Sequence, residues 1–176
     1  MRRALFTLLA LTACKTAPMN PAATSDHAPR PFTAEQIRDA TPQGTTWTYE
    51  MRKLREPPVR QVTRVVAADD ARVTFAVDSF NAGGEALGGT KTSTATWTEL
   101  EAHATFPAAH TKILDVEVDT PAGRFEAWRY EVRDPDAKVV RIKNFYFAKS
   151  RPGAPVLYEQ TDDGEIQFRM VLVESK

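Results

Sequence analysis

The chain has 176 residues, and its 23 Lys and Arg balance 23 Asp and Glu, so the formal net charge is zero. This length predicts one domain with a core of ordinary size, and the balanced charge gives no general electrostatic attraction to nucleic acid or to anionic lipid head groups. Hydrophobic residues make up 42% of the chain, which excludes an intrinsically disordered protein.

The N-terminus has the layout of a secretory signal. Arg2 and Arg3 precede an apolar run from Ala4 to Leu11. As a helix this run is ~12 Å long, too short to cross a hydrocarbon core of ~30 Å. We therefore expect residues 1–13 to be a cleaved signal peptide and not a membrane anchor.

The residues around the predicted cleavage point carry a more specific pattern. Leu11-Thr12-Ala13-Cys14 resembles the lipobox of bacterial lipoprotein signal peptides, and Cys14 is the single Cys of the chain. The resemblance implies that the Cys14 thiol receives a diacylglyceryl group, that the chain is cut just before Cys14, and that the new amino group often receives a further acyl chain such as palmitate. The alternative is an ordinary secretory signal with an incidental Cys.

Two or more acyl chains hold a protein stably on a membrane, at ~0.8 kcal/mol per buried methylene. Lys15 follows Cys14 where an Asp would favour the inner membrane in enteric bacteria. By the same resemblance, Lys15 favours the outer membrane, with the protein facing the periplasm or the cell surface.

The segment after Cys14 is rich in proline, with Pro18, Pro21, Pro29 and Pro31. Proline fixes its own backbone angle and restricts the residue before it, so this segment predicts an extended linker of ~50 Å. We expect a lipidated Cys and tether over residues 14–31 and a β-rich globular domain over residues 32–176.

The domain opens with a short helix. Thr33 and Gln36 have the spacing of a capping box, and Phe32 and Ile37 that of a hydrophobic staple. These signals predict a helix of about two turns that ends before Pro42.

From Thr46 onward, apolar and polar residues alternate as in half-buried strands. Trp47, Tyr49 and Met51 share one side of the first such run. Turn residues separate nine predicted runs: 46–51, 59–67, 72–80, 90–100, 114–119, 125–132, 138–148, 156–160 and 166–172.

Short connections between these runs predict antiparallel neighbours. The fold class is mainly β (α+β): a curved antiparallel sheet or half-barrel of about nine strands, apolar on one side, with one short N-terminal helix in its hollow. A closed barrel or a sandwich of two sheets fits the pattern nearly as well.

A second resemblance covers roughly the C-terminal half. Residues 119–128, 145–148 and 152–156 are similar to segments of uncharacterised exported bacterial lipoproteins. The sheets of those proteins resemble the half-barrels of periplasmic lipoprotein carriers, which hold acyl chains in an apolar hollow. The resemblance implies the fold and suggests a hydrophobic ligand by analogy.

Signals of catalysis are weak. Lipidation consumes the one thiol, and His103 and His110 lie beside Glu101 without the spacing of a metal motif. We expect a protein that is not an enzyme, with no catalytic residue, metal or cofactor.

Six aromatic residues are candidates for lining an apolar ligand pocket, although aromatic residues also dominate ordinary cores. They are Trp47, Trp97, Trp128, Tyr130, Phe145 and Phe147. The preferred interpretation is a membrane-anchored module that binds a hydrophobic ligand or an envelope protein. The alternative is a structural accessory protein of the envelope with no ligand, and an enzyme is the weakest of the three hypotheses.

The lipid anchor is directly testable. Cells grown with labelled palmitate are expected to label the wild-type protein and not the Cys14→Ala variant, because the thiol is the attachment point. Label retained on the variant would refute the lipobox assignment.

Overall fold

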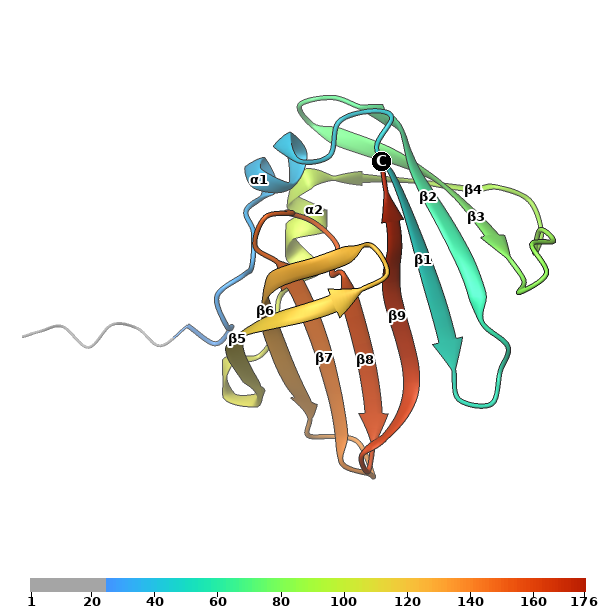
Figure 1. The fold of residues 1–176 in the computed structure, drawn as a ribbon. Coiled ribbons are helices and arrows are strands. Elements are labelled where there is room, and N and C mark those ends of the chain that lie inside the picture. The colour runs from blue at the N-terminus through green and yellow to red at the C-terminus, as the bar shows by residue number, and fades with distance from the viewer. Residues whose placement is uncertain (1–24) are drawn as a thin grey trace, which may run out of the picture.

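The computed structural model describes residues 25–176 (Figure 1). The predicted signal peptide, Cys14 and the first part of the predicted tether lie outside the described residues. Within the described part, none of the helices has the length and apolar character needed to cross a membrane.

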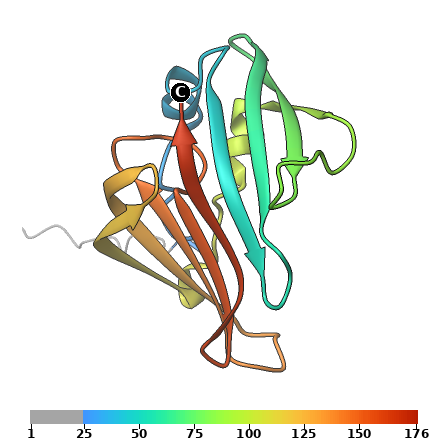
Figure 2. The same cartoon turned by 45° about the vertical axis from the view of Figure 1, so that its right-hand side comes forward.

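Nine strands form one antiparallel sheet in the order β4-β3-β2-β1-β9-β8-β7-β6-β5. The sheet curls around its concave side and stays open, since β4 and β5 lie at its two edges (Figures 1 and 2). This confirms the predicted curved antiparallel sheet over the closed barrel and the sandwich. The strands are β1 (Thr46–Lys53), β2 (Val59–Ala68), β3 (Arg72–Phe80), β4 (Lys91–Thr96), β5 (Thr111–Thr120), β6 (Gly123–Asp134), β7 (Arg141–Ala148), β8 (Leu157–Asp162) and β9 (Glu165–Ser175).

The first helix, α1 (Ala34–Asp39), begins as predicted. The Thr33 side chain accepts a hydrogen bond from the backbone N–H of Gln36, and the Gln36 side chain accepts one from the N–H of Thr33. These two bonds pair backbone groups that a helix start otherwise leaves unsatisfied. Ile37 is the buried residue of the helix.

A second helix, α2 (Trp97–Ala102), corrects the prediction of one strand over residues 90–100. Strand β4 ends at Thr96 because Thr96 and Glu99 form another capping box, with 2.7 Å from the Thr96 nitrogen to the Glu99 carboxylate. Trp97 is thereby turned from a strand position into the core, where it is 4% exposed. A 3-10 turn, η1 (Ala108–His110), follows.

The sheet is apolar on its concave side, where α1, α2 and the chain after α2 cover it (Figures 1 and 2). This inner core contains aromatic and branched side chains from both halves of the chain. Its fully buried members are Phe32, Ile37, Val65, Val73, Trp97, Phe106, Tyr130, Val132 and Phe147.

The outer side of β7, β8 and β9 is also buried, which corrects the prediction of a sheet covered on one side only. The far end of the β5–β6 hairpin bends over these strands (Figure 1). Val118 and Ala127 of the hairpin pack there with Ala148, Leu157 and Val171 in a second core. An antiparallel hairpin this long can twist and bend enough to cover its own sheet.

The N-terminal boundary also differs from the prediction. Residues 26–31, which the sequence assigns to the tether, lie against the domain and are called the strap below. Ala28 is 8% exposed and donates its N–H to the carbonyl of Phe106 at 2.9 Å, and Tyr130 donates its hydroxyl to the carbonyl of Pro29 at 2.9 Å. Proline tolerates this extended conformation, so the prolines do not prevent docking.

Among residues 25–176, every buried core residue lies between Ala28 and Leu172. Because these residues share an extensive core, we expect residues 25–176 to fold as one unit.

Leu172→Ala in residues 25–176 is expected to lower the free energy of unfolding by roughly 2–5 kcal/mol, because the Leu172 side chain is fully buried and its removal leaves a void. Leu87→Ala, at a position 49% exposed, removes the same atoms from a loop and is expected to change it by less than ~0.5 kcal/mol. Urea denaturation followed by Trp fluorescence measures both. Equal effects would contradict the assigned packing.

Candidate binding cavity

A cavity of about 430 Å³ lies between the concave side of the sheet and the two helices. This volume falls within the ~300–1,000 Å³ typical of small-molecule sites. Strands β1, β2, β3, β4, β7 and β9 form one wall, and α1, α2 and the chain after α2 form the other. Residues 153–155, in the loop between β7 and β8, also line it.

The cavity is lined mainly by aromatic and aliphatic side chains. Phe145 and Phe106 come from opposite walls, and their ring centroids are 4.8 Å apart. Trp47 and Phe75, on neighbouring parts of the sheet, have centroids 6.1 Å apart. Such surfaces favour an apolar occupant, since each Å² removed from water is worth ~25 cal/mol.

The six aromatic residues singled out from the sequence occupy three kinds of position. Trp47, Phe145 and Phe147 line the cavity. Trp97 and Tyr130 are buried in the inner core, and Trp97 donates its indole N–H to the carbonyl of Asp69 at 2.8 Å.

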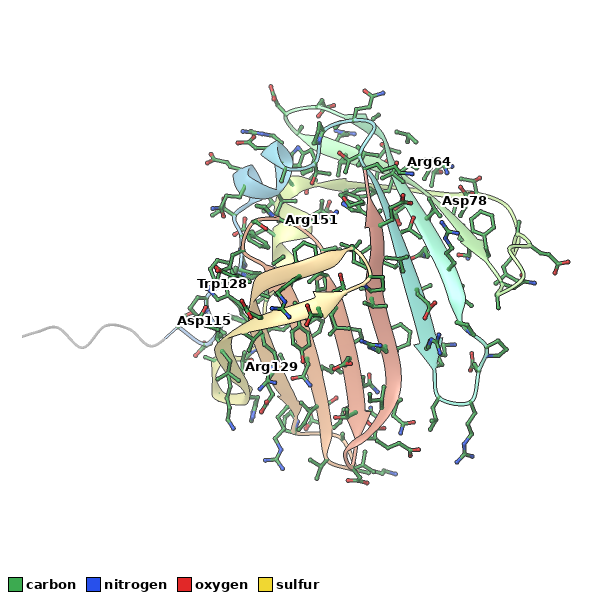
Figure 3. All side chains as sticks on the ribbon, viewed as in Figure 1. Arg64, Asp78, Asp115, Trp128, Arg129 and Arg151 are labelled. Atoms are coloured by element: carbon green, nitrogen blue, oxygen red, sulfur yellow. The ribbon has the colours of Figure 1, made fainter. Side chains whose placement is uncertain are left out.

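Trp128, the sixth of these aromatics, is partly buried against Phe32, with ring centroids 5.9 Å apart. The ammonium group of Lys149 lies over the Trp128 ring and also pairs with Asp115; Figure 3 labels both Trp128 and Asp115. Contact of any of the six with a ligand stays a prediction.

Several lining residues were not singled out from the sequence. Tyr49 and Phe75 could have been, because their strands alternate and each shares a face with a residue already expected to be buried. Phe106 and Leu100 could not be found from strand alternation. Phe106 lies in the loop after α2, and Leu100 lies in α2, a helix that the sequence did not predict.

Tyr49 and Thr41 are buried residues of the cavity wall that carry a hydroxyl. Tyr49 is 6% exposed, and burial raises the pKa of its hydroxyl to about 12. No group within residues 25–176 hydrogen-bonds to this hydroxyl. The unpaired polar side-chain atoms sealed from solvent in that range are Nε of Arg129, Oδ1 of Asn144 and Nε of Arg169. The Tyr49 oxygen is not one of them, so it borders open space.

The strap holds the helical wall of the cavity in place. Arg30 pairs with Glu101 of α2 at 2.8 Å, and the same carboxylate accepts the N–H of Ala34 at the start of α1 at 3.1 Å. The hydrogen bond from Arg30 is the main cause of a lowered pKa of Glu101. One carboxylate thus connects the strap with both helices.

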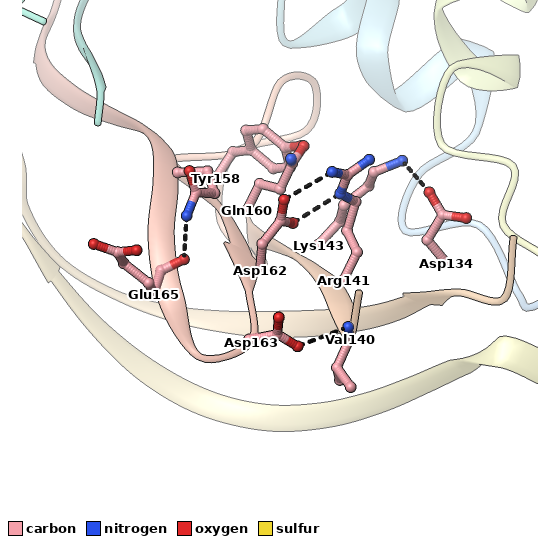
Figure 4. Close-up of polar contacts among 10 residues, drawn as sticks. Asp134, Val140, Arg141, Lys143, Tyr158, Gln160, Asp162, Asp163 and Glu165 are labelled. Carbon is pink, nitrogen blue, oxygen red and sulfur yellow. Dashed lines mark hydrogen bonds and ion pairs between the residues drawn. The ribbon is translucent and has the colours of Figure 1, made fainter. Parts of the chain in front are cut away.

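A group of paired charges adjoins the cavity on the concave side (Figure 4). Arg141 forms two hydrogen bonds with Asp162, of 2.8 and 2.7 Å, and lowers the pKa of that carboxyl group. Lys143 pairs with Asp134 at 3.5 Å. Tyr158, whose ring packs on Phe145 at 4.7 Å, connects this group with the cavity. Each cation here has its own carboxylate, so the group is electrically neutral.

The arrangement offers no metal site within residues 25–176, since no three His, Cys, Asp or Glu side chains gather closely enough to hold an ion. His103 and Glu101 both line the cavity, but Glu101 is bound to Arg30 and His110 lies in η1. The site supports binding of an apolar molecule better than proton transfer.

Solved structures with a similar fold include a proposed lipoprotein from Parabacteroides distasonis, with a TM-score of 0.52 and 13% identity over 84% of this chain and 98% of its own. MucB in complex with MucA(peri) has a TM-score of 0.53 and 11% identity over 81% of this chain. The alignment covers 53% of MucB, so this chain spans about half of its length.

A proposed exported protein with a YmcC-like fold from Bacteroides fragilis superimposes with a TM-score of 0.48 and 12% identity, over 77% of this chain and 97% of its own. At these identities the likeness to the first two structures shows a shared fold and nothing finer. No family model matches the chain, and no curated protein matches it in sequence.

Glu101→Ala is expected to loosen the strap and both helix starts, because it removes the acceptor for Arg30 and for the Ala34 N–H. Hydrogen exchange of the Ala28 and Ala34 amides is expected to become faster in the variant. Glu126→Ala, at an exposed position on β6, is the control and is expected to leave both amides protected. Unchanged exchange in Glu101→Ala would contradict the connecting role.

The same contact sets a pH dependence. Because folding lowers the pKa of Glu101 below its usual 4.5, the stabilisation is fully present above that pH and is lost as pH falls through the folded-state pKa. The stability difference between wild type and Glu101→Ala is therefore expected to shrink below about pH 4.5.

Proposed function

We propose that this chain is an exported lipoprotein of the bacterial envelope, anchored through lipid at Cys14, that binds a hydrophobic molecule in the cavity between its sheet and helices. The cavity itself carries the proposal: it has an ordinary ligand-site volume, aromatic walls and the buried, unpaired hydroxyl of Tyr49. Binding without catalysis is the activity that this lining supports.

The apolar lining of the cavity favours a ligand over a purely structural role. The cavity is partly open to solvent, and Phe145, Trp47 and Met170 are among the apolar residues that line it. A ligand that entered would remove this apolar surface from water and bind to walls that are already in place, which limits the entropy cost of binding.

The anchor rests on the lipobox resemblance at residues 11–14, and the fold shared with a proposed lipoprotein from Parabacteroides distasonis is consistent with it. Lys15 favours the outer membrane. A lipid anchor at Cys14 would hold the domain close to the membrane, where apolar molecules are concentrated.

A partner protein of the envelope is the second candidate. MucB, which shares this fold, was solved in a complex with MucA(peri). The open sheet also leaves β4 and β5 as edge strands that an extended segment can join by main-chain hydrogen bonds. This candidate predicts binding that does not depend on the cavity.

Filling the cavity separates the two candidates. Ala104→Phe places a ring at a lining position and is expected to weaken binding of the neutral apolar dye N-phenyl-1-naphthylamine to residues 25–176 at least tenfold. Ala82→Phe, in the exposed loop after β3, is the control and is expected to bind as wild type does. Melting temperatures verify that both variants are folded.

Native mass spectrometry of wild-type residues 25–176, purified without detergent, is expected to show a bound apolar molecule that Ala104→Phe lacks. Absence of both dye and co-purified molecule from the wild type would refute the hydrophobic-ligand proposal and leave the partner-protein candidate.

A further inference from the structure

Two polar groups that lack partners belong to elements that line the cavity. The first is the Tyr49 hydroxyl on β1, buried in the cavity wall and bordering open space as described above. The second is the guanidinium of Arg151, in the loop between β7 and β8 (labelled in Figure 3). Residues 153–155 of the same loop line the cavity, and Arg151 stands two positions before them.

Arg151 differs from the other partly buried arginines of the described chain. Arg141 pairs with Asp162, and Arg129 contacts Glu131. Arg151 forms no ion pair with any carboxylate among residues 25–176, although it is only partly exposed. Burial lowers the pKa of Arg151, and Tyr49 partly offsets this effect. A cation withdrawn from water without a counter-charge is costly.

The positions of the two groups follow from the fold. Loop residue Val156 accepts a hydrogen bond from the N–H of Leu172 on β9, at 2.8 Å, and Leu172 is the register partner of Tyr49. The loop is thus fixed beside β1. Tyr49 on β1 and Arg151 in the loop, 102 positions apart in the sequence, are thereby brought to neighbouring parts of the fold, and each influences the pKa of the other.

We propose that Arg151 and the Tyr49 hydroxyl bind the anionic head group of an amphiphile, a carboxylate or a phosphate, while its apolar tail occupies the cavity. This inference rests on the proposed function and names the ligand class. The guanidinium supplies paired N–H donors that match two oxygens of either head group, together with the missing counter-charge.

Tyr49 suits this role as a donor. Its pKa of about 12 keeps the phenol protonated at neutral pH, so it donates its hydrogen to the anion and adds no negative charge. The neutral, fully paired group around Arg141 lies elsewhere on the concave side and has no free charge to offer. Head-group preference therefore depends on Arg151.

The test uses residues 25–176 and competition against N-phenyl-1-naphthylamine. Dodecanoate, dodecyl phosphate and dodecanol carry the same tail on a carboxylate, a phosphate and a neutral head, and each is used below its micelle concentration. We expect at least one anion to bind ten times or more tighter than dodecanol at neutral pH. The better of the two anions identifies the head-group class.

Four variants locate the preference. Arg151→Gln is expected to reduce the anion-to-alcohol ratio to below two while dodecanol binding stays within twofold of wild type, and Tyr49→Phe is expected to reduce the ratio about threefold or more. Arg151→Lys keeps the positive charge but lacks the paired N–H donors of the guanidinium, and it is expected to retain part of the anion preference. Arg133→Gln, which removes an exposed arginine of β6, is expected to retain all of it.

Three results would overturn the inference. Equal affinity for dodecanol and both anions would remove the head-group preference while leaving the hydrophobic-ligand function intact. An undiminished preference in Arg151→Gln would place the anion elsewhere. Failure of the dye and all three competitors to bind wild type would refute the proposed function itself.

Discussion

The pairing of β1 with β9 is the contact on which the rest of the molecule depends. Every other pair in the sheet joins strands that are neighbours in the sequence, whereas this one joins the beginning of the strand region to its end. Without it the chain would form two separate meanders, neither able to enclose a hollow. Its register changes at Thr48 and Tyr49, and a β-bulge of this kind bends a strand and redirects a side chain. The irregularity therefore occurs at the residue whose hydroxyl borders the cavity.

The concave side of an open curved sheet must be covered by other segments of the same chain. Here two six-residue helices cover part of that side, and both are short enough to need help from outside their own backbone. Capping boxes fix their starts, while Glu101 joins α2, α1 and the strap. The walls of the cavity are therefore held by polar contacts at its margin, which leaves the interior free of the side chains that would fill it.

Much of the fold could be predicted because its signals are local. Eight of the nine predicted runs match the observed strands to within three residues at each end, and Thr33 marked the start of α1. Thr96 and Glu99 carry the same capping signal, but the threonines before them favour a strand and masked it. The bend of the β5–β6 hairpin and the strap depend on contacts between distant residues. Alternation likewise placed Trp47 and Tyr49 on one side of their strand. Nothing in the spacing of Tyr49 and Arg151, by contrast, indicates that the fold brings β1 and the loop with Arg151 together.

The route of the strap has a mechanical consequence. It runs antiparallel to the chain that follows α2, with His27 opposite Pro107. Within residues 25–176, the backbone bonds of Asp26 and Ala28 are therefore the first that a force applied from the N-terminal side would meet. If the chain is tied to a bilayer, drag on the domain passes through those bonds and then through Arg30 into α2 before it reaches the sheet. Tension from the anchor thus reaches the helices that line the cavity before it reaches the strands of the sheet.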